Sequence, residues 1–336
     1  MVKTTKEIEG VAMCESSKLG EKPFFQKISF SWVGKKCLLC PQSQKKTKYC
    51  WAYASIGAMS AALSIKSKKA VVPLSKHHLT DCLFKYYPDP KKEAELKEGE
   101  TYGCSCSKAY RFAVEQGIAE EESYPYAMRR GDCKCTETMK KVKIAAYQRI
   151  NIRRLSKGQI EEHIKRQPIK CSIRSYDSLK NHVGQSVYMG PTMEEIEDRR
   201  ASLARGEKDS THSMLIMGFG TDEDGQNYYL VQNSWEERWG YHGHDTGPST
   251  KLMVPPLENV ELSQPVLTTE VEALVQPLQH VASNFEPQLA ISTFKSFYVS
   301  GMWRTLCECI TQFSAESSES LRRLRCRKVV YLSEDN

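Results

Sequence analysis

The chain has 336 residues, of which 40% are hydrophobic and 26% are charged, and its formal net charge is +7. This composition is typical of a soluble globular protein with a sizeable core, arranged as two domains or as one large two-lobed domain. No segment approaches the roughly 18 apolar residues that a membrane-spanning helix needs, so no membrane partner is expected.

The first 27 residues show little periodicity and are predicted to form a flexible N-terminal lead. They lack the apolar core of a secretory signal, so the expected location is the cytoplasm or the nucleus, where thiols are mostly reduced. A lysosomal, vacuolar or secreted location is expected only if the N-terminus is incomplete. The 13 cysteines are many for a reducing compartment, and their odd number leaves at least one unpaired.

Cys50 stands at the start of a predicted helix that runs from residue 51 to about residue 65. Small apolar residues recur there at three- and four-residue steps, which indicates a helix inside a domain. The free N–H groups at the helix start and the positive end of its dipole favour a thiolate, as do the preceding lysines. An unpaired cysteine is also commonly buried and inert, so this stretch alone leaves both interpretations open. The lysines are Lys45, Lys46 and Lys48.

Three segments follow in the first half of the chain. Residues 71–82 are predicted to form a short extended piece and then a helix that Ser75 caps. Residues 85–100 are polar, charged and interrupted by proline, which predicts a surface insertion. Residues 107–116 are predicted to be helical up to Gly117.

The second half of the chain combines two helices with a β-hairpin. Residues 158–167 and 193–206 are predicted to be helical, and the second of these helices is expected to be exposed. The β-rich runs 213–220 and 228–235 are joined through an Asp-Gly pair, which is a hairpin-type signal.

After residue 250 the sequence changes character, with two prolines, serine-rich spacers and one amphipathic helix predicted at 269–281. We predict that residues 251–336 are a loosely attached C-terminal extension, to which the sequence assigns no function. A basic cluster at 322–328 has the composition of a nuclear-address or nucleic-acid patch. Because no aromatic-studded sheet or groove motif accompanies it, a nucleic-acid partner is not expected.

The side chains that catalysis by a cysteine requires occur in a suggestive order along the chain. Gln44 and Cys50 are followed by His212, at the start of one predicted strand, and by Asn233, at the end of the next. Paired strands can place a histidine beside an asparagine, and Trp235 can cover their contact from water. Such a set supplies a nucleophile, a base, an amide that orients the base, and donors for an oxyanion.

Over about residues 28–250 the sequence resembles the papain-like (cathepsin-type, C1 family) cysteine proteases. Seven separate stretches match blocks of that family in the family's order. The resemblance implies an α+β fold with two lobes and an active-site cleft between them. The helical lobe is expected at about 45–140 and an antiparallel, β-barrel-like lobe at about 141–250. The matching stretches are QKKTKYCWAYA, LSKHHLTDC, EESYPY, QPIKCSI, VYMGP, HSMLIMGFG and NSWEERWG.

The resemblance also implies a role for each residue of the site. Cys50 is the nucleophile, His212 is its general base and later acid, and Asn233 holds the imidazole ring. Gln44 donates its side-chain amide to the oxyanion beside the backbone N–H of Cys50. From these groups we predict a thiolate–imidazolium ion pair. The residues expected at the substrate are Ser105, Cys106, Ser107, Ser172, Ser213 and Trp235.

The expected activity is that of a cysteine-type endopeptidase, a thiol protease that hydrolyses peptide bonds through an acyl-enzyme intermediate. Its expected partners are a peptide or protein substrate and a protein inhibitor, and no cofactor or metal is expected. The alternative is a non-catalytic papain-fold protein that binds peptides or protein partners through a distorted cleft.

Departures from the family pattern around the cleft support this alternative. A Cβ at Cys106 or Ser107, where the family has glycine, is expected to crowd a substrate strand. Further departures are Lys48 and Tyr49 in place of glycine and serine, Ser105 in place of asparagine, Glu236 in place of glycine, and His244 in place of an aromatic residue.

The remaining cysteines lead to three further expectations. Cys82 and Cys133 match a family disulfide pair, and we predict that they lie close enough to bridge but are reduced in the cell. Cys104 matches a family cysteine whose partner position is Thr47, which leaves Cys40 as a substitute partner. The cysteine pairs at 37 and 40, 104 and 106, and 133 and 135 leave a structural zinc site open as a minor alternative.

Overall fold

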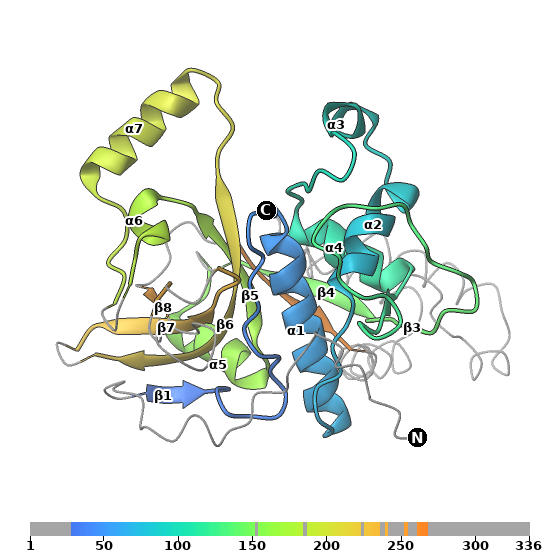
Figure 1. The fold of residues 1–336 in the computed structure, drawn as a ribbon. Coiled ribbons are helices and arrows are strands. Elements are labelled where there is room, and N and C mark those ends of the chain that lie inside the picture. The colour runs from blue at the N-terminus through green and yellow to red at the C-terminus, as the bar shows by residue number, and fades with distance from the viewer. Residues whose placement is uncertain are drawn as a thin grey trace, which may run out of the picture.

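A helical lobe and a β lobe lie on either side of one long helix, α1 (Cys50–Ser67), in the computed structural model of the chain (Figure 1). The α+β class and the two-lobed arrangement predicted from the sequence are therefore confirmed. The predicted N-terminal lead and the helix predicted at 269–281 lie outside the described residues. The structure describes residues 28–151, 154–183, 187–222, 225–235, 239–240, 252–254 and 261–267.

Helix α1 forms where the sequence offers small side chains on every face of a helix. It contacts α2 and α4 on one side and β5, β6 and β9 on the other, which explains why alanines and serines on all sides of it are buried. Alanine has the highest helix propensity, and its short side chain lets neighbouring backbones approach. The helix ends where Lys68 adopts a left-handed backbone with φ +55°, so it runs slightly beyond the predicted residues 51–65.

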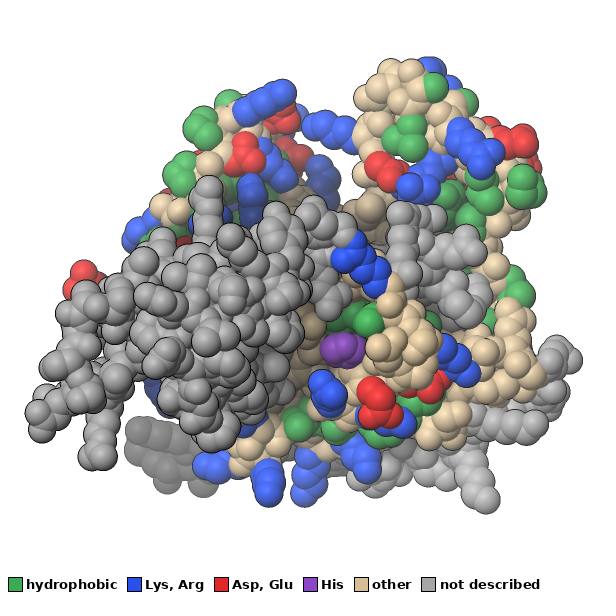
Figure 2. All heavy atoms as spheres, turned by 180° about the vertical axis from the view of Figure 1, so that it is seen from behind, with side chains coloured by type: hydrophobic (Ala, Val, Ile, Leu, Met, Phe, Trp, Pro, Cys, Tyr) green, Lys and Arg blue, Asp and Glu red, His purple; other side chains and the backbone are tan. Residues whose placement is uncertain are grey.

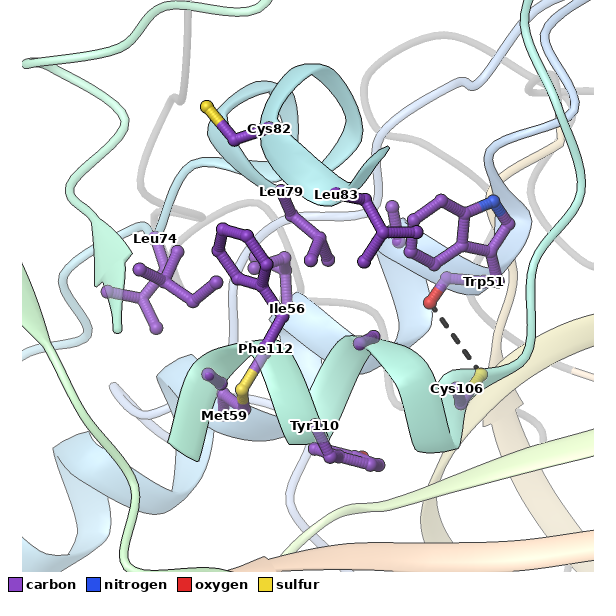
Figure 3. Close-up of a cluster of buried hydrophobic side chains, with 14 of the residues drawn as sticks. Trp51, Ile56, Met59, Leu74, Leu79, Cys82, Leu83, Cys106, Tyr110 and Phe112 are labelled. Atoms are coloured by element: carbon purple, nitrogen blue, oxygen red, sulfur yellow. Dashed lines mark hydrogen bonds between the residues drawn. The ribbon is translucent and has the colours of Figure 1, made fainter. Parts of the chain in front are cut away.

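The helical lobe has its core where α1, α2 (Lys76–Tyr86) and α4 (Cys106–Glu115) meet, as Figure 3 shows. Ser75 caps α2 as predicted, because its hydroxyl accepts the N–H of His78 at 2.9 Å. A two-stranded ribbon, β2 (Ile118–Ala119) and β3 (Lys141–Val142), completes this lobe. Side chains of the core include Trp51, Ile56, Met59, Leu79, Leu83, Tyr110 and Phe112.

The segment predicted as a surface insertion at 85–100 contains a short helix, α3 (Pro90–Glu95). The Asp89 carboxylate accepts the N–H of Lys92, and Pro90 occupies the first turn, where its missing N–H is not needed. No residue of α3 is buried, so its place at the surface agrees with the prediction. Figure 1 shows α3 projecting from the helical lobe at the same end of the molecule as α7 (Met193–Ala204) of the β lobe.

The β lobe is built on an antiparallel sheet whose described strands follow the order β4-β9-β5-β6-β7-β8, with β1 beside β6. The pairing of β6 with β7 confirms the predicted hairpin. The path is open, so the predicted term barrel-like describes it only loosely. The strands are β1 (Ile28–Ser31), β4 (Ala146–Ile150), β5 (Ile169–Arg174), β6 (Thr211–Thr221), β7 (Asn227–Gln232), β8 (Leu252–Val254) and β9 (Glu261–Val266), and the other helices are α5 (Lys157–Arg166) and α6 (Asp177–Lys180).

The sheet continues beyond the domain boundary that we predicted at residue 250. Strand β9 lies between β4 and β5 and pairs with both, and β8 pairs with the edge of β7. Leu262 and Val266 are buried, because β9 fills the gap that β4 and β5 would otherwise leave in the sheet. The prediction that residues from 251 onward form a separate extension is therefore wrong for 252–254 and 261–267.

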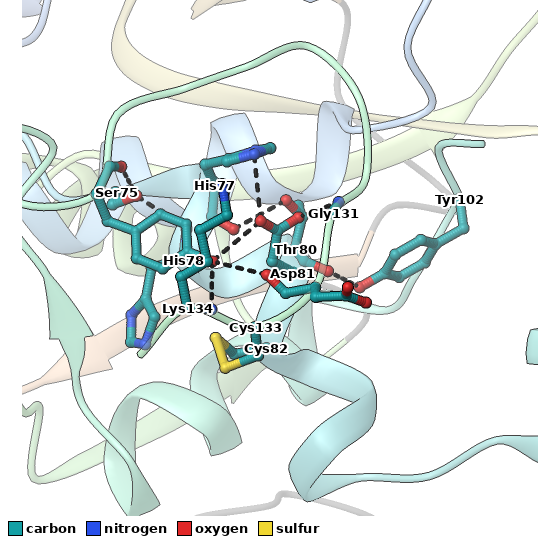
Figure 4. Close-up of polar contacts among 12 residues, drawn as sticks. Ser75, His77, His78, Thr80, Asp81, Cys82, Tyr102, Gly131, Cys133 and Lys134 are labelled. Atoms are coloured by element: carbon teal, nitrogen blue, oxygen red, sulfur yellow. Dashed lines mark hydrogen bonds and ion pairs between the residues drawn. A yellow bond between two sulfur atoms is a disulfide. The ribbon is translucent and has the colours of Figure 1, made fainter. Parts of the chain in front are cut away.

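A disulfide and a buried polar cluster connect α2 to the loop that follows β2 (Figure 4). Cys82 and Cys133 are bridged with a Cα–Cα distance of 4.6 Å, so the predicted proximity is confirmed, while their reduction in the cell stays a prediction. Beside them, the Asp81 carboxylate accepts the N–H of Gly131 at 2.8 Å and the hydroxyl of Tyr124 at 3.0 Å. The Asp81 carboxylate also lies 3.2 Å from the Nε2 of His77.

The second disulfide expectation is wrong, because Cys104 is a free cysteine and does not pair with Cys40. Within the described residues, histidine, cysteine and carboxylate side chains form no group of three that could hold a metal ion. None of the described helices is long and apolar enough to cross a membrane. On the face drawn in Figure 2, Lys and Arg side chains are scattered among acidic and hydrophobic ones.

Candidate active site

Cys50 is the first residue of α1, at the point where this helix begins between the two lobes. Tyr49, the preceding N-cap residue, makes no side-chain capping hydrogen bond. In the first turn, the N–H of Ala52 donates to the Tyr49 carbonyl at 2.8 Å, and the N–H of Trp51 is hydrogen-bonded to the Cys50 thiol. Tyr49 is fully buried and packs edge-to-face against Trp51 and Tyr102. The large residue that replaces a family serine therefore lies in the core of the helical lobe and leaves Cys50 at the helix start.

His212 and Asn233 are brought together by the β6–β7 pair. His212 lies near the start of β6, and Asn233 directly follows the end of β7. Because the two strands are antiparallel, the start of β6 and the end of β7 lie side by side. The His212 Nε2 and the Asn233 Oδ1 are 2.6 Å apart, and both residues are buried. Because an amide oxygen can only accept, Nε2 carries the proton, and Nδ1 of the neutral ring is left to accept one.

Trp235 covers this contact as predicted. Its ring stacks on the His212 ring with a centroid distance of 4.1 Å and an interplanar angle of 29°. His212 is only 4% exposed. The stacked indole keeps water from the His212–Asn233 hydrogen bond and adds to the desolvation of the imidazole.

The surroundings favour a neutral thiol and a neutral imidazole, contrary to the ion pair predicted from the sequence. Burial raises the pKa of Cys50, although the N–H groups of Ser213 and Trp51 oppose this shift. Burial also lowers the pKa of His212 to about 4, against a smaller opposite effect of the bond to Asn233. The helix start was the sequence argument for a thiolate, and desolvation outweighs it here.

Gln44 is held with its amide oriented by two neighbours. Its Nε2 donates to the carbonyl of Thr47 at 2.6 Å, and its Oε1 accepts the hydroxyl of Ser234 at 2.6 Å. The second Nε2 hydrogen remains for an oxyanion, as the resemblance implied. The N–H of Ser234 also donates to the Asn233 Oδ1 at 2.7 Å, so Ser234 links the residue that orients His212 to the oxyanion donor.

Three of the six residues predicted at the substrate lie next to one another. The Ser172 and Ser213 hydroxyls are 3.1 Å apart, and the Cys106 Sγ is 3.7 Å from the Ser213 Oγ and from the Trp51 carbonyl oxygen. The Cys106 thiol therefore contacts the residues that directly follow His212 and Cys50, which is where the resemblance placed the substrate site. Trp235, also predicted there, lies against His212.

The other two predicted substrate residues belong to the first turn of α4. The Ser105 hydroxyl is the N-cap of this helix and accepts the N–H of Lys108 at 3.3 Å. Ser107 is half-buried in the same turn. Among the described residues, neither Ser105 nor Ser107 is hydrogen-bonded to Cys50 or His212, so their contact with a substrate stays a prediction, as it does for the other four.

Sequence reasoning missed two residues of the site. Ser234 stands inside the motif that contains Asn233 and Trp235, and this position was the available signal. Lys170 is 1% exposed, and its charge acts to lower the pKa of both Cys50 and Cys171. A lysine within an apolar strand was the signal for Lys170. Two of the departures from the family pattern, Glu236 and His244, lie outside the described residues.

A family model described as "Papain family cysteine protease" matches residues 28–246, and the chain belongs to this family. A cysteine protease of Blomia tropicalis is 23% identical over 216 residues, which are 64% of this chain and 59% of the relative. The vignain of Phaseolus vulgaris is 26% identical over 220 residues, which are 64% and 52% of the two chains. This chain thus spans little more than half the length of the curated relatives that it matches.

Solved structures show the same fold. Bromelain from Ananas comosus, in complex with the E64 inhibitor, aligns with a TM-score of 0.52 and 21% identity, over 71% of this chain and 98% of bromelain. The proform of the ragweed pollen cysteine protease Amb a 11 aligns with a TM-score of 0.54 and 22% identity, over 72% and 66% of the two chains.

Proposed function

We propose that this chain is a cysteine endopeptidase that hydrolyses peptide bonds through an acyl-enzyme intermediate on Cys50. The observation that carries the proposal is the buried 2.6 Å contact between His212 Nε2 and Asn233 Oδ1 beneath Trp235. The Cys50 thiol lies at a helix start and is hydrogen-bonded by the N–H of Ser213, the residue that follows His212. The contact between His212 and Asn233 fixes the tautomer that leaves Nδ1 free to accept the thiol proton.

In the acylation step, the Cys50 sulfur attacks the carbonyl carbon of the substrate while its proton passes to His212. The transfer accompanies the attack, because burial favours the neutral form of both groups before it. The negative charge that develops on the carbonyl oxygen meets the Gln44 amide and the N–H of Cys50.

In the following steps, the imidazolium of His212 gives its proton to the departing amine as the C–N bond breaks. A water molecule then loses a proton to His212 and attacks the thioester, which releases the carboxylic acid and restores the thiol. Asn233 keeps the ring oriented throughout and exchanges no proton, so its loss should cost less than the loss of His212.

The substrates that we propose are peptides or unfolded segments of proteins, and we propose a protein inhibitor as a further partner. Bromelain, which shares the fold, has been solved with the E64 inhibitor. A peptide-like epoxide of that kind is therefore the most direct probe of the site, because the ring opens when a positioned thiol attacks it.

The test is to incubate the full chain with E64 and locate the modified residue by mass spectrometry, together with hydrolysis of a fluorogenic peptide. We expect one adduct, on Cys50, and loss of hydrolysis in Cys50→Ser and His212→Ala. Cys135→Ser is the matched control, because Cys135 is also a free and half-buried thiol but lies in the helical lobe. An adduct that spreads over several cysteines, with no hydrolysis by the unmodified chain, would refute the proposal and favour a peptide-binding protein.

A further inference from the structure

Two lysines form the tip of the turn that joins the oxyanion donor to the nucleophile. The N–H of Thr47 donates to the carbonyl of Gln44 at 3.0 Å, so Lys45 and Lys46 are the two central residues of a tight turn. Both are exposed. In the proposed reaction Gln44 and Cys50 act on the same carbonyl group of the substrate, so the turn between them borders the expected position of the scissile bond.

The backbone of Lys45 is in the left-handed region, with φ +48°. Residues other than glycine, asparagine and aspartate adopt this conformation rarely, and doing so costs conformational free energy. The same strain at Lys68 is explained by the end of α1, whereas no helix ends at Lys45. A strained lysine at the tip of an active-site turn suggests that its charge is used there.

Two other lysines, one just after this turn and one at the start of α4, have acidic partners. Lys48 pairs with Glu100 at 3.1 Å, and Lys108 at the start of α4 pairs with Asp89 at 3.7 Å. Across the described residues, no carboxylate lies within ion-pair distance of Lys45 or Lys46. Lys45 and Lys46 are therefore two exposed positive charges on the turn between Gln44 and Cys50 that no described carboxylate neutralises, whereas the other lysine that acts on Cys50, Lys170, is buried.

We propose that Lys45 and Lys46 give the site a preference for peptides that carry an acidic residue next to the scissile bond. This inference rests on the proposed peptidase function and names its substrate class. An exposed ion pair shifts an equilibrium by up to about fivefold, so two such lysines predict a preference of about tenfold in kcat/KM at low salt. The preference should shrink at about 1 M salt, where the Debye length is about 3 Å.

The experiment compares three quenched-fluorescence peptides that differ only by glutamate, glutamine or lysine at the two positions flanking the cleaved bond. The ratio of kcat/KM between the glutamate and lysine peptides is measured for the wild type and for Lys45→Gln combined with Lys46→Gln. We expect this ratio to be about ten in the wild type and to fall to about one in the double variant.

The matched control is Lys68→Gln combined with Lys69→Gln. This control also removes two positive charges, includes Lys68 with its left-handed backbone, and lies at the far end of α1. Because an 18-residue helix is about 27 Å long, this pair should leave the ratio unchanged. A wild-type ratio near one, or a ratio that falls equally in both double variants, overturns the proposal while hydrolysis of the glutamine peptide upholds the peptidase function.

A second measurement decides the matter if no peptide is cleaved. Alkylation rates of Cys50 with anionic iodoacetate and neutral iodoacetamide are followed on the Cys50 peptide by mass spectrometry. Positive charge from Lys45 and Lys46 should raise the iodoacetate-to-iodoacetamide ratio in the wild type above that in their double variant, with no change in the Lys68 and Lys69 control. An equal ratio in all three proteins overturns the proposed charge effect, whatever the fate of the peptidase function.

Discussion

Replacing Trp235 by alanine should move the acidic limb of the pH–rate profile to higher pH. In the wild type, burial holds the pKa of His212 at about 4, so the imidazole is neutral and able to accept the thiol proton over the whole range above that pH. Trp235 is the ring stacked directly on His212, at 4.1 Å. Its removal admits water to one face of the imidazole, which stabilises the charged form and raises the pKa.

Complete rehydration would return the pKa of His212 to about 6.5. At 1.36 kcal/mol per pKa unit, burial therefore disfavours the charged imidazole by about 3 kcal/mol. Trp235 covers only one face of the ring, so we expect a rise of about one unit. The expected consequence is about a threefold loss of kcat/KM near pH 4.5 relative to the loss at pH 7.5, because the fraction of His212 that is neutral at pH 4.5 falls by about that factor.

The assay is the pH dependence of kcat/KM for a fluorogenic peptide, together with the pH dependence of Cys50 alkylation. Trp235→Phe is the control, because a phenyl ring keeps an aromatic stack over His212 and should keep the limb near its wild-type position. An acidic limb that stays in place or moves downward in Trp235→Ala would show that desolvation by this residue does not set the pKa of His212.

Three further changes test other parts of the structure. Removing the disulfide by Cys82→Ala with Cys133→Ala should lower the free energy of unfolding by about 4 kcal/mol, because the bridge closes a loop with a sequence separation of 51. A urea midpoint equal to that of the oxidised wild type would contradict this prediction. His78 is fully buried and its pKa is lowered to about 4 by burial, so the unfolded chain binds its proton first and stability should fall as the pH drops from about 6.5 to 4. The free energy of unfolding is measured with urea at pH 7 and pH 4.5. Between these pH values, the variant His78→Asn should lose about 2 kcal/mol less of this free energy than the wild type. Cys106→Gly should raise kcat/KM for small peptides if the thiol crowds the substrate, and an unchanged or lower value would remove crowding as an explanation.

The order of the catalytic residues and the elements that carry them could be predicted from the sequence. The run of small residues after Cys50 has a helical period on its own, and two β-rich runs joined by Asp-Gly predict a hairpin wherever they lie. Once the hairpin forms, antiparallel pairing places the start of one strand beside the end of the other. Local pattern was therefore enough to bring His212 to Asn233.

Tertiary structure decided what depends on contacts between distant segments. Strand β9 enters the sheet between β4 and β5. The short sequence of β9 does not identify these neighbours, because strand pairing and register depend on which face of the finished sheet is buried. The charge state of the Cys50–His212 pair is another such property. The helix start at Cys50 is local and favours a thiolate, but the desolvation that outweighs it is the sum of every atom both lobes pack around the two groups.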